Sequence, residues 1–180
     1  MKACLIYGCA ALAVAACVPR GERVESAPAP QERLSGSAEL RDAAGAVRAR
    51  AAVEQEDGGV RVRVEATDMS PGAYGVHIHA IGRCDPPDFA SAGPHWNPTG
   101  RMHGRENPDG PHKGDLPNLL VGADARGSFE YRIPDVAIGA GRGDLFDEDG
   151  AALVIHERAD DLRTDPSGNS GARIACGVLR

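Results

Sequence analysis

The chain has 180 residues, enough for one well-buried domain and too few for two of ordinary size once a leader is removed. Its formal net charge of -6 and isoelectric point near 5.5 argue against binding to a phosphate backbone. No block rich in Lys, Arg and interleaved aromatic residues offsets that balance, so nucleic acid is not an expected partner.

The N-terminus has the pattern of an export signal. Lys2 precedes an apolar run that is too short to span a bilayer, and small residues follow the run. We therefore expect residues 1–16 to be a signal peptide and the mature protein to be exported.

The leader ends in VAAC (14–17), which is similar to the bacterial lipobox, where a peptidase cuts before a diacylated cysteine. This similarity implies that Cys17 is the lipidated first residue of the mature protein and that a lipid anchor is its only membrane contact. Val18 rather than Asp at the next position favours the outer membrane, facing the bacterial periplasm. Ordinary cleavage after an A-x-A such as residues 13–15, with Cys17 unmodified, is the alternative.

Residues 17–34 are expected to form the lipidated N-terminus and a flexible linker. The segment VPRGERVESAPAPQ (18–31) is rich in Pro, Ala and charged residues and has no apolar period. The remaining residues, 35–180, are expected to form one domain.

Short segments with a period of two follow one another through this domain. In the clearest, GVRVRVEAT (59–67), Val60, Val62 and Val64 lie on one face and Arg61 and Arg63 on the other, after the turn EDGG. Similar runs, separated by Gly, Asp, Pro and Asn turns, are SAELRDA (37–43), AVRARAAVEQ (46–55), GVHIHAIG (75–82), LLVGAD (119–124), SFEYRI (128–133), ALVIHE (152–157) and RIACGVL (173–179). No segment has a convincing helical period, so we predict an all-β antiparallel sandwich or flattened barrel.

Two segments interrupt this rhythm. Residues 83–117 form a long Gly- and Pro-rich stretch, and residues 160–172 a shorter polar one. Long loops in a compact domain are usually functional or disordered.

Five cysteines are present, and only Cys84 and Cys176 lie outside the leader and the lipidation site. Two cysteines in an oxidising compartment suggest one disulfide, with two free buried thiols as the alternative. Closing a loop of this length stabilises the fold by about 4 to 5 kcal/mol in the loop-entropy treatment.

The six histidines concentrate around the long loop. Three lie on the loop: His95, His103 and His112. The other three lie on predicted strands: His77, His79 and His156. His77 and His79 share a face of their strand, which is equally expected of a solvated sheet surface. Together with Asp115 the histidines supply seven metal donors, whereas two four-coordinate ions need eight bonds, so one imidazolate would have to bridge two ions. Metal bonds would also order a loop that has little core of its own.

Five segments together resemble copper/zinc superoxide dismutase: GVHIHAIGRC (75–84), SAGPHWNPTGRMHG (91–104), HKGDLPN (112–118), LVIHERADDL (153–162) and GNSGARIACGV (168–178). The resemblance runs from about Ser35 to the C-terminus and implies a Greek-key β-sandwich with two functional loops, one copper and one zinc per subunit. It implies copper at His77, His79, His95 and His156, and zinc at His95, His103, His112 and Asp115. His95 would be the shared imidazolate.

The same resemblance assigns roles to two more residues. Asp160 would link His77 to His103 and orient both rings, the alternative being a solvated charge pair with Asp161. Arg173 would lie at the mouth of the copper site and attract the anionic substrate.

The implied activity is conversion of superoxide to oxygen and hydrogen peroxide by alternate reduction and oxidation of copper, with zinc holding His95 while that ring takes up and returns a proton. A periplasmic copper and zinc buffer without turnover is the rival function, and it needs the same ligands but not Arg173. A relative that retains the fold without metals is disfavoured by the complete ligand set. A monomer and a homodimer both remain open.

The sequence departs from the familiar eukaryotic pattern in three places. The insert DPPDFA (85–90) lengthens the loop before His95, the polar loop is short, and Ser167 replaces the usual threonine. These departures resemble the bacterial branch and leave the channel width and subunit contacts open.

Overall fold

The structure, a computed structural model, describes residues 34–139 and 141–180. The predicted signal peptide, Cys17 and nearly all of the predicted linker lie outside the described residues. Among the described residues, no helix is long and apolar enough to cross a membrane.

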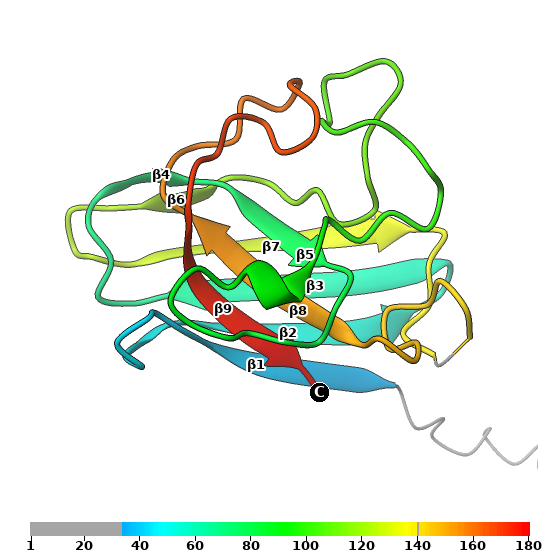
Figure 1. Cartoon of the computed structure of the whole chain (residues 1–180), viewed down its shortest axis with the longest axis horizontal. Coiled ribbons are helices and arrows are strands. Elements are labelled where there is room, and N and C mark those ends of the chain that lie inside the picture. The colour runs from blue at the N-terminus through cyan, green and yellow to red at the C-terminus, as the bar shows by residue number, and fades with distance from the viewer. Residues whose placement is uncertain (1–33, 140) are drawn as a thin grey trace, which may run out of the picture. The chain divides into compact units, whose positions relative to one another are not determined.

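The fold is an all-antiparallel β-structure, as predicted (Figure 1). Its strands are β1 (Ser35–Arg41), β2 (Val47–Glu56), β3 (Gly59–Ala66), β4 (Gly72–Tyr74), β5 (Val76–His79), β6 (Leu119–Val121), β7 (Gly127–Pro134), β8 (Ala151–His156) and β9 (Arg173–Leu179). Seven strands form one curled sheet in the order β5-β8-β9-β1-β2-β3-β7, and β4 pairs with β6. A single 3-10 turn, η1 (Ala90–Ala92), is the only helical element in this part of the chain.

The alternating sequence of β3 explains how the core forms. Val60, Val62 and Val64 are fully buried, whereas Arg63 between them is exposed. The strand pairs with β2 through a tight turn in which Gly58 has a φ of +71°, a conformation that favours glycine. The buried faces of the sheet then enclose one hydrophobic core.

Strand β8 differs because all six of its residues are buried. Leu153 and Ile155 face the main core. Ala152 and Val154 face a smaller cluster that also contains Phe89 and Cys176. A strand covered on both faces reads as a continuous apolar run. Because β8 is buried along its whole length, His156 at its C-terminal end also lies in the interior.

The predicted disulfide is confirmed: Cys84 at the start of the long loop is bonded to Cys176 in β9. The long loop and the polar loop then meet above one end of the sheet (Figure 1). Glu106 N–H donates to the Leu162 carbonyl at 2.9 Å, and Glu106 forms an ion pair with Arg163 at 2.8 Å. The two loops therefore form one unit over the edge that carries the histidines.

Candidate metal centre

Backbone pairing brings the long loop onto β5. Isolated bridges join His77 to Asp115 and His79 to His95. Trp96 N–H donates to the Ile78 carbonyl at 2.8 Å, and Ile78 N–H donates to the Gly114 carbonyl at 2.9 Å. Loop histidines are thereby placed beside strand histidines.

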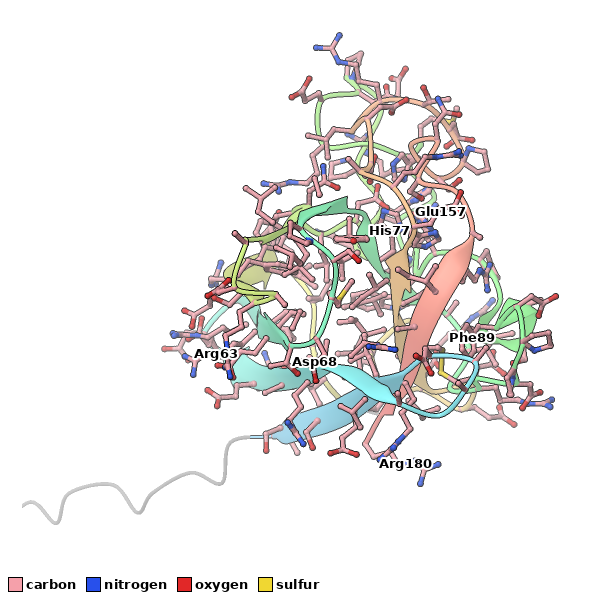
Figure 2. All side chains as sticks on the ribbon, turned by 90° about the vertical axis from the view of Figure 1, so that its left-hand side faces the viewer. Arg63, Asp68, His77, Phe89, Glu157 and Arg180 are labelled. Atoms are coloured by element: carbon pink, nitrogen blue, oxygen red, sulfur yellow. A yellow bond between two sulfur atoms is a disulfide. The ribbon has the colours of Figure 1, made fainter. Side chains whose placement is uncertain are left out.

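All six histidines and two carboxylates meet in the interior of the domain, where Figure 2 labels His77. Exposed fractions range from zero for His77 and His103 to 8% for His95 and His112. The solvated-surface interpretation of His77 and His79 is therefore wrong. Burying this many polar rings is unfavourable unless each polar atom has a partner.

The first group contains His77, His79, His95 and His156, whose donor atoms lie within 4.8 Å of one another. In three of these rings one nitrogen is already engaged. His77 Nε2–H donates to Asp160 Oδ2 at 2.7 Å, His79 Nδ1–H to the Gly93 carbonyl at 2.8 Å, and His156 Nδ1–H to the Gly171 carbonyl at 3.1 Å. Because carbonyl and carboxylate oxygens only accept, these bonds fix the tautomers and leave the other nitrogens as lone-pair donors.

The remaining nitrogens of this group have no hydrogen-bond partner. They are His77 Nδ1 and the Nε2 atoms of His79, His95 and His156, all fully buried. Four convergent imidazole lone pairs suit copper, which tops the divalent affinity series and accepts imidazole ligands.

The second group surrounds one oxygen of Asp115. The Nδ1 atoms of His95, His103 and His112 lie 3.0, 3.1 and 3.1 Å from Asp115 Oδ1, and those of His95 and His112 are 3.4 Å apart. Metal bonds of 2.0–2.1 Å in a tetrahedron give ligand separations of about 3.3 to 3.4 Å. The separation of His95 from His112 matches this range, and the three distances to Asp115 are slightly shorter, so the group is compatible with zinc. His103 Nδ1 makes no hydrogen bond despite its proximity to Asp115.

His77 also lies near the second group, since it shares a set of close donors with His95, His103 and Asp115. Its Nε2 is bonded to Asp160, however, and its free Nδ1 belongs with the first group. His112 therefore completes the second group, and His95 belongs to both groups.

Protonation of the first group is strongly disfavoured. Burial lowers the pKa of His77 to about 3, of His79 to about 2 and of His156 to about 4, and it also lowers the pKa of His95. The rings are thus held in the neutral form that ligates metal.

The two carboxylates remain charged for a different reason. Burial raises the pKa of Asp115 and of Asp160, but hydrogen bonds from the imidazoles outweigh it and lower both values below their usual range. Burial lowers the pKa of His103, yet its hydrogen bond to Asp160 and its 3.1 Å contact with the charge of Asp115 prevail and raise it to about 9. The two carboxylates thus favour a proton on the His103 ring, and a divalent cation bound at His103 Nδ1 would replace that proton.

The carboxylate of Asp160 contacts one ring of each group, on the nitrogen that does not face the other ligands. Its Oδ2 accepts from His77 and its Oδ1 lies 3.0 Å from His103 Nε2, while only 4% of the residue is exposed. The alternative of a solvated pair with Asp161 is therefore wrong.

Arg173 lies beside the first group, where a shift in register between Ile155 and His156 pairs His156 with Arg173. Its guanidinium donates to the carbonyls of Phe89 at 2.7 Å and Gly93 at 2.8 Å. Burial lowers the pKa of Arg173, but an arginine remains charged at neutral pH.

An open cavity of about 750 Å³ leads to these side chains. We call it the channel. It is lined by His79, His95, His112, His156, Ser167 and Arg173, all predicted, and also by Asn97, Arg101, Met102 and Asp165. The only sequence signal for the latter four was their position on the two loops between predicted ligands.

A sequence model of the family described as "Copper/zinc superoxide dismutase (SODC)" matches residues 44–179. The chain belongs to the copper/zinc superoxide dismutase family.

Individual relatives agree with this assignment. The superoxide dismutase-like protein YojM of Bacillus subtilis is 49% identical over 128 residues, a match that covers 70% of this chain and 65% of that protein. Superoxide dismutase [Cu-Zn] 1 of Aquifex aeolicus is 46% identical over 130 residues, covering 70% of this chain and 76% of the relative. A crystal structure of a SOD-like protein from Bacillus subtilis superposes with a TM-score of 0.75 at 41% identity, covering 80% of this chain and 97% of the other. Family membership implies copper and zinc, and the two buried groups are compatible with both metals.

Proposed function

We propose that this protein is a superoxide dismutase, which converts two superoxide anions and two protons to oxygen and hydrogen peroxide. Copper would be held by His77, His79, His95 and His156, and zinc by His95, His103, His112 and Asp115. The observation that carries the proposal is the set of four buried, partnerless imidazole nitrogens, three of them on rings that line a channel that also contains Arg173.

Copper, when bound, supplies the one-electron couple that the reaction requires. The chain's own residues supply the rest. Arg173 offers a positive charge to the anion within the channel. Asp160 holds the rings of His77 and His103 in fixed tautomers. His95 Nε2 faces the first group, proposed to hold copper, while its Nδ1 lies at the second group, proposed to hold zinc. His95 is therefore the ring from which a proton can be delivered at Nε2.

A metal buffer without turnover would use the same ligands. The channel and the charge of Arg173 favour the dismutase, because a store needs neither. We expect the purified protein to contain one copper and one zinc and to inhibit superoxide-dependent cytochrome c reduction.

Arg173→Glu separates the two functions. Reversing this charge is expected to slow dismutation by about tenfold or more and to remove the fall in rate with ionic strength, because the substrate is an anion. Metal content by mass spectrometry should not change. The matched control is Arg126→Glu, which reverses an exposed arginine outside the channel. Equal rates for Arg173→Glu and wild type across a salt series would contradict the assignment.

We also propose that the chain is exported and anchored to the outer membrane through lipidated Cys17. The support is the VAAC pattern at 14–17 and the proline-rich segment after it. Cys17→Ser is expected to abolish fatty-acid labelling and to leave the protein uncleaved or soluble. A mature form that is unlabelled in both proteins would favour ordinary cleavage.

A further inference from the structure

A second pocket, of about 560 Å³, borders the second group on the side of β7. His112 and Asp115 form part of its wall, and Tyr131 of β7 forms another part. Three cationic side chains, Arg101, Arg105 and Lys113, also line it, and we call it the cationic pocket.

The three cationic side chains contact uncharged groups, two backbone carbonyls and an aromatic ring, so no negative charge among the described residues balances theirs. Lys113 Nζ donates to the Pro134 carbonyl at 2.8 Å, and Arg101 Nη2 to the Gly110 carbonyl at 3.3 Å. The Arg105 guanidinium lies 4.5 Å from the centre of the Tyr131 ring. In the described part of the chain, none of them forms an ion pair with a carboxylate.

Most other described arginines are neutralised. Carboxylates lie within ion-pair distance of Arg41, Arg48, Arg50, Arg61, Arg63, Arg83, Arg132, Arg158 and Arg163. Three uncompensated cations around one pocket are therefore unusual in a chain with a net charge of -6.

The carboxylate in the wall does not change this balance. Asp115 Oδ1 lies against three imidazoles, and Oδ2 accepts from the backbone N–H groups of Gly104 at 2.9 Å and His112 at 3.0 Å. Its oxygens are thus occupied by the three imidazoles of the second group and by backbone N–H groups of the long loop, and only 2% of Asp115 is exposed.

We propose that the cationic pocket binds a phosphate-type oxyanion. Two guanidinium groups and an ammonium retain donors that suit the several oxygens of a phosphate. Contact with the ring of Tyr131 restrains the Arg105 side chain, which reduces the entropy lost on binding. The pocket is larger than one phosphate group, so it accepts either free phosphate or a phosphate carried by a lipid headgroup.

Arg101 and His112 line both the cationic pocket and the channel. If the proposed dismutase function holds, a bound oxyanion lowers the positive potential at the channel and slows the arrival of superoxide. Binding itself does not depend on that function.

The test is calorimetric titration of inorganic phosphate into the metal-loaded full chain at low ionic strength. The double variant Arg105→Gln/Lys113→Gln should weaken binding about tenfold or more, because it removes two charged donors. Arg126→Gln, an exposed arginine elsewhere, and Arg173→Gln, which removes the channel cation, should each retain affinity within about twofold.

Sedimentation of the unlipidated Cys17→Ser chain with phosphatidylcholine vesicles, with and without phosphatidic acid, tests the lipid source. Binding only to vesicles that contain phosphatidic acid, lost in the double variant, would identify a lipid phosphate; binding of free phosphate would identify the soluble anion. Absence of saturable binding to both, or binding that Arg173→Gln abolishes and the double variant retains, would overturn the proposal. Dismutase activity is measured separately, so its loss would leave this result unaffected.

Discussion

The carboxylate of Asp160 occupies space that a side chain at position 168 would fill, and Gly168 leaves that space free. A Cβ atom at that position would lie 1.7 Å from Asp160 Oδ1 and 2.8 Å from His103 Nε2, and Gly168 has a φ of +63°. One glycine thereby allows a single carboxylate to accept from rings of both the first and the second group.

Gly168→Ala is expected to displace Asp160 and to reduce zinc affinity about 10- to 100-fold, the usual effect of losing a partner that orients a ligand. Competition with a zinc chelator measures this change. Gly45→Ala is the matched control, because Gly45 also has a positive φ, +87°, but nothing lies within 4 Å of its Cβ position. If the two variants bind zinc equally well, then a side chain at position 168 does not disturb Asp160, and the proposed role of Gly168 is refuted.

At the scale of elements, the two loops are secured to the sheet by a few specific connections. The disulfide joins the long loop to β9, and Arg173 at the start of β9 binds the Phe89 and Gly93 carbonyls of the same loop. Gly93 O also accepts from His79, so Arg173 and a ring of the first group share one backbone oxygen. The metal bonds would add the remaining restraint on residues 94–117.

Removing the metals with a chelator should therefore loosen the loops selectively. We expect hydrogen exchange at backbone amides of residues 94–117 and 160–172 to accelerate, while amides of β2 and β3 remain protected by their paired ladder. Re-addition of zinc should restore protection. Uniform acceleration across β2 and β3 would show instead that the metals stabilise the whole fold.

The strands were predictable because their alternation reflects burial, as in β3, where each valine is buried. Strand β4 was missed, since three residues that include Gly72 carry no periodic signal. Period alone could not decide whether His77 and His79 face solvent, because it assigns a shared face and not what covers that face. The partners of Arg173 and the cationic pocket were equally hidden: they join residues up to 84 positions apart through backbone carbonyls and loop packing.

At the scale of the whole molecule, the buried histidines couple stability to pH. In the metal-free protein the pKa values of His77, His79 and His156 lie below the 6.5 of an unfolded chain. Below pH 6.5 the unfolded chain therefore binds more protons than the folded one, and stability falls as the pH falls. His103, with its pKa raised to about 9, acts in the opposite sense: its contribution is complete below pH 6.5 and is lost as the pH rises through 9.

We accordingly predict that the free energy of unfolding of the chelator-treated protein is greatest near neutral pH. It should decline more steeply towards acid, where four lowered histidines act, His95 among them, than towards alkali, where one raised histidine acts. Each group contributes at most about 1.4 kcal/mol per pH unit. Urea unfolding between pH values of about 4 and about 9 measures the profile. Metal-loaded protein is the control, and its plateau should extend further towards acid because the ions replace protons at the ligand nitrogens. A metal-free profile that is flat, or that rises on acidification below pH 6.5, would mean that these rings are not held neutral in the folded state.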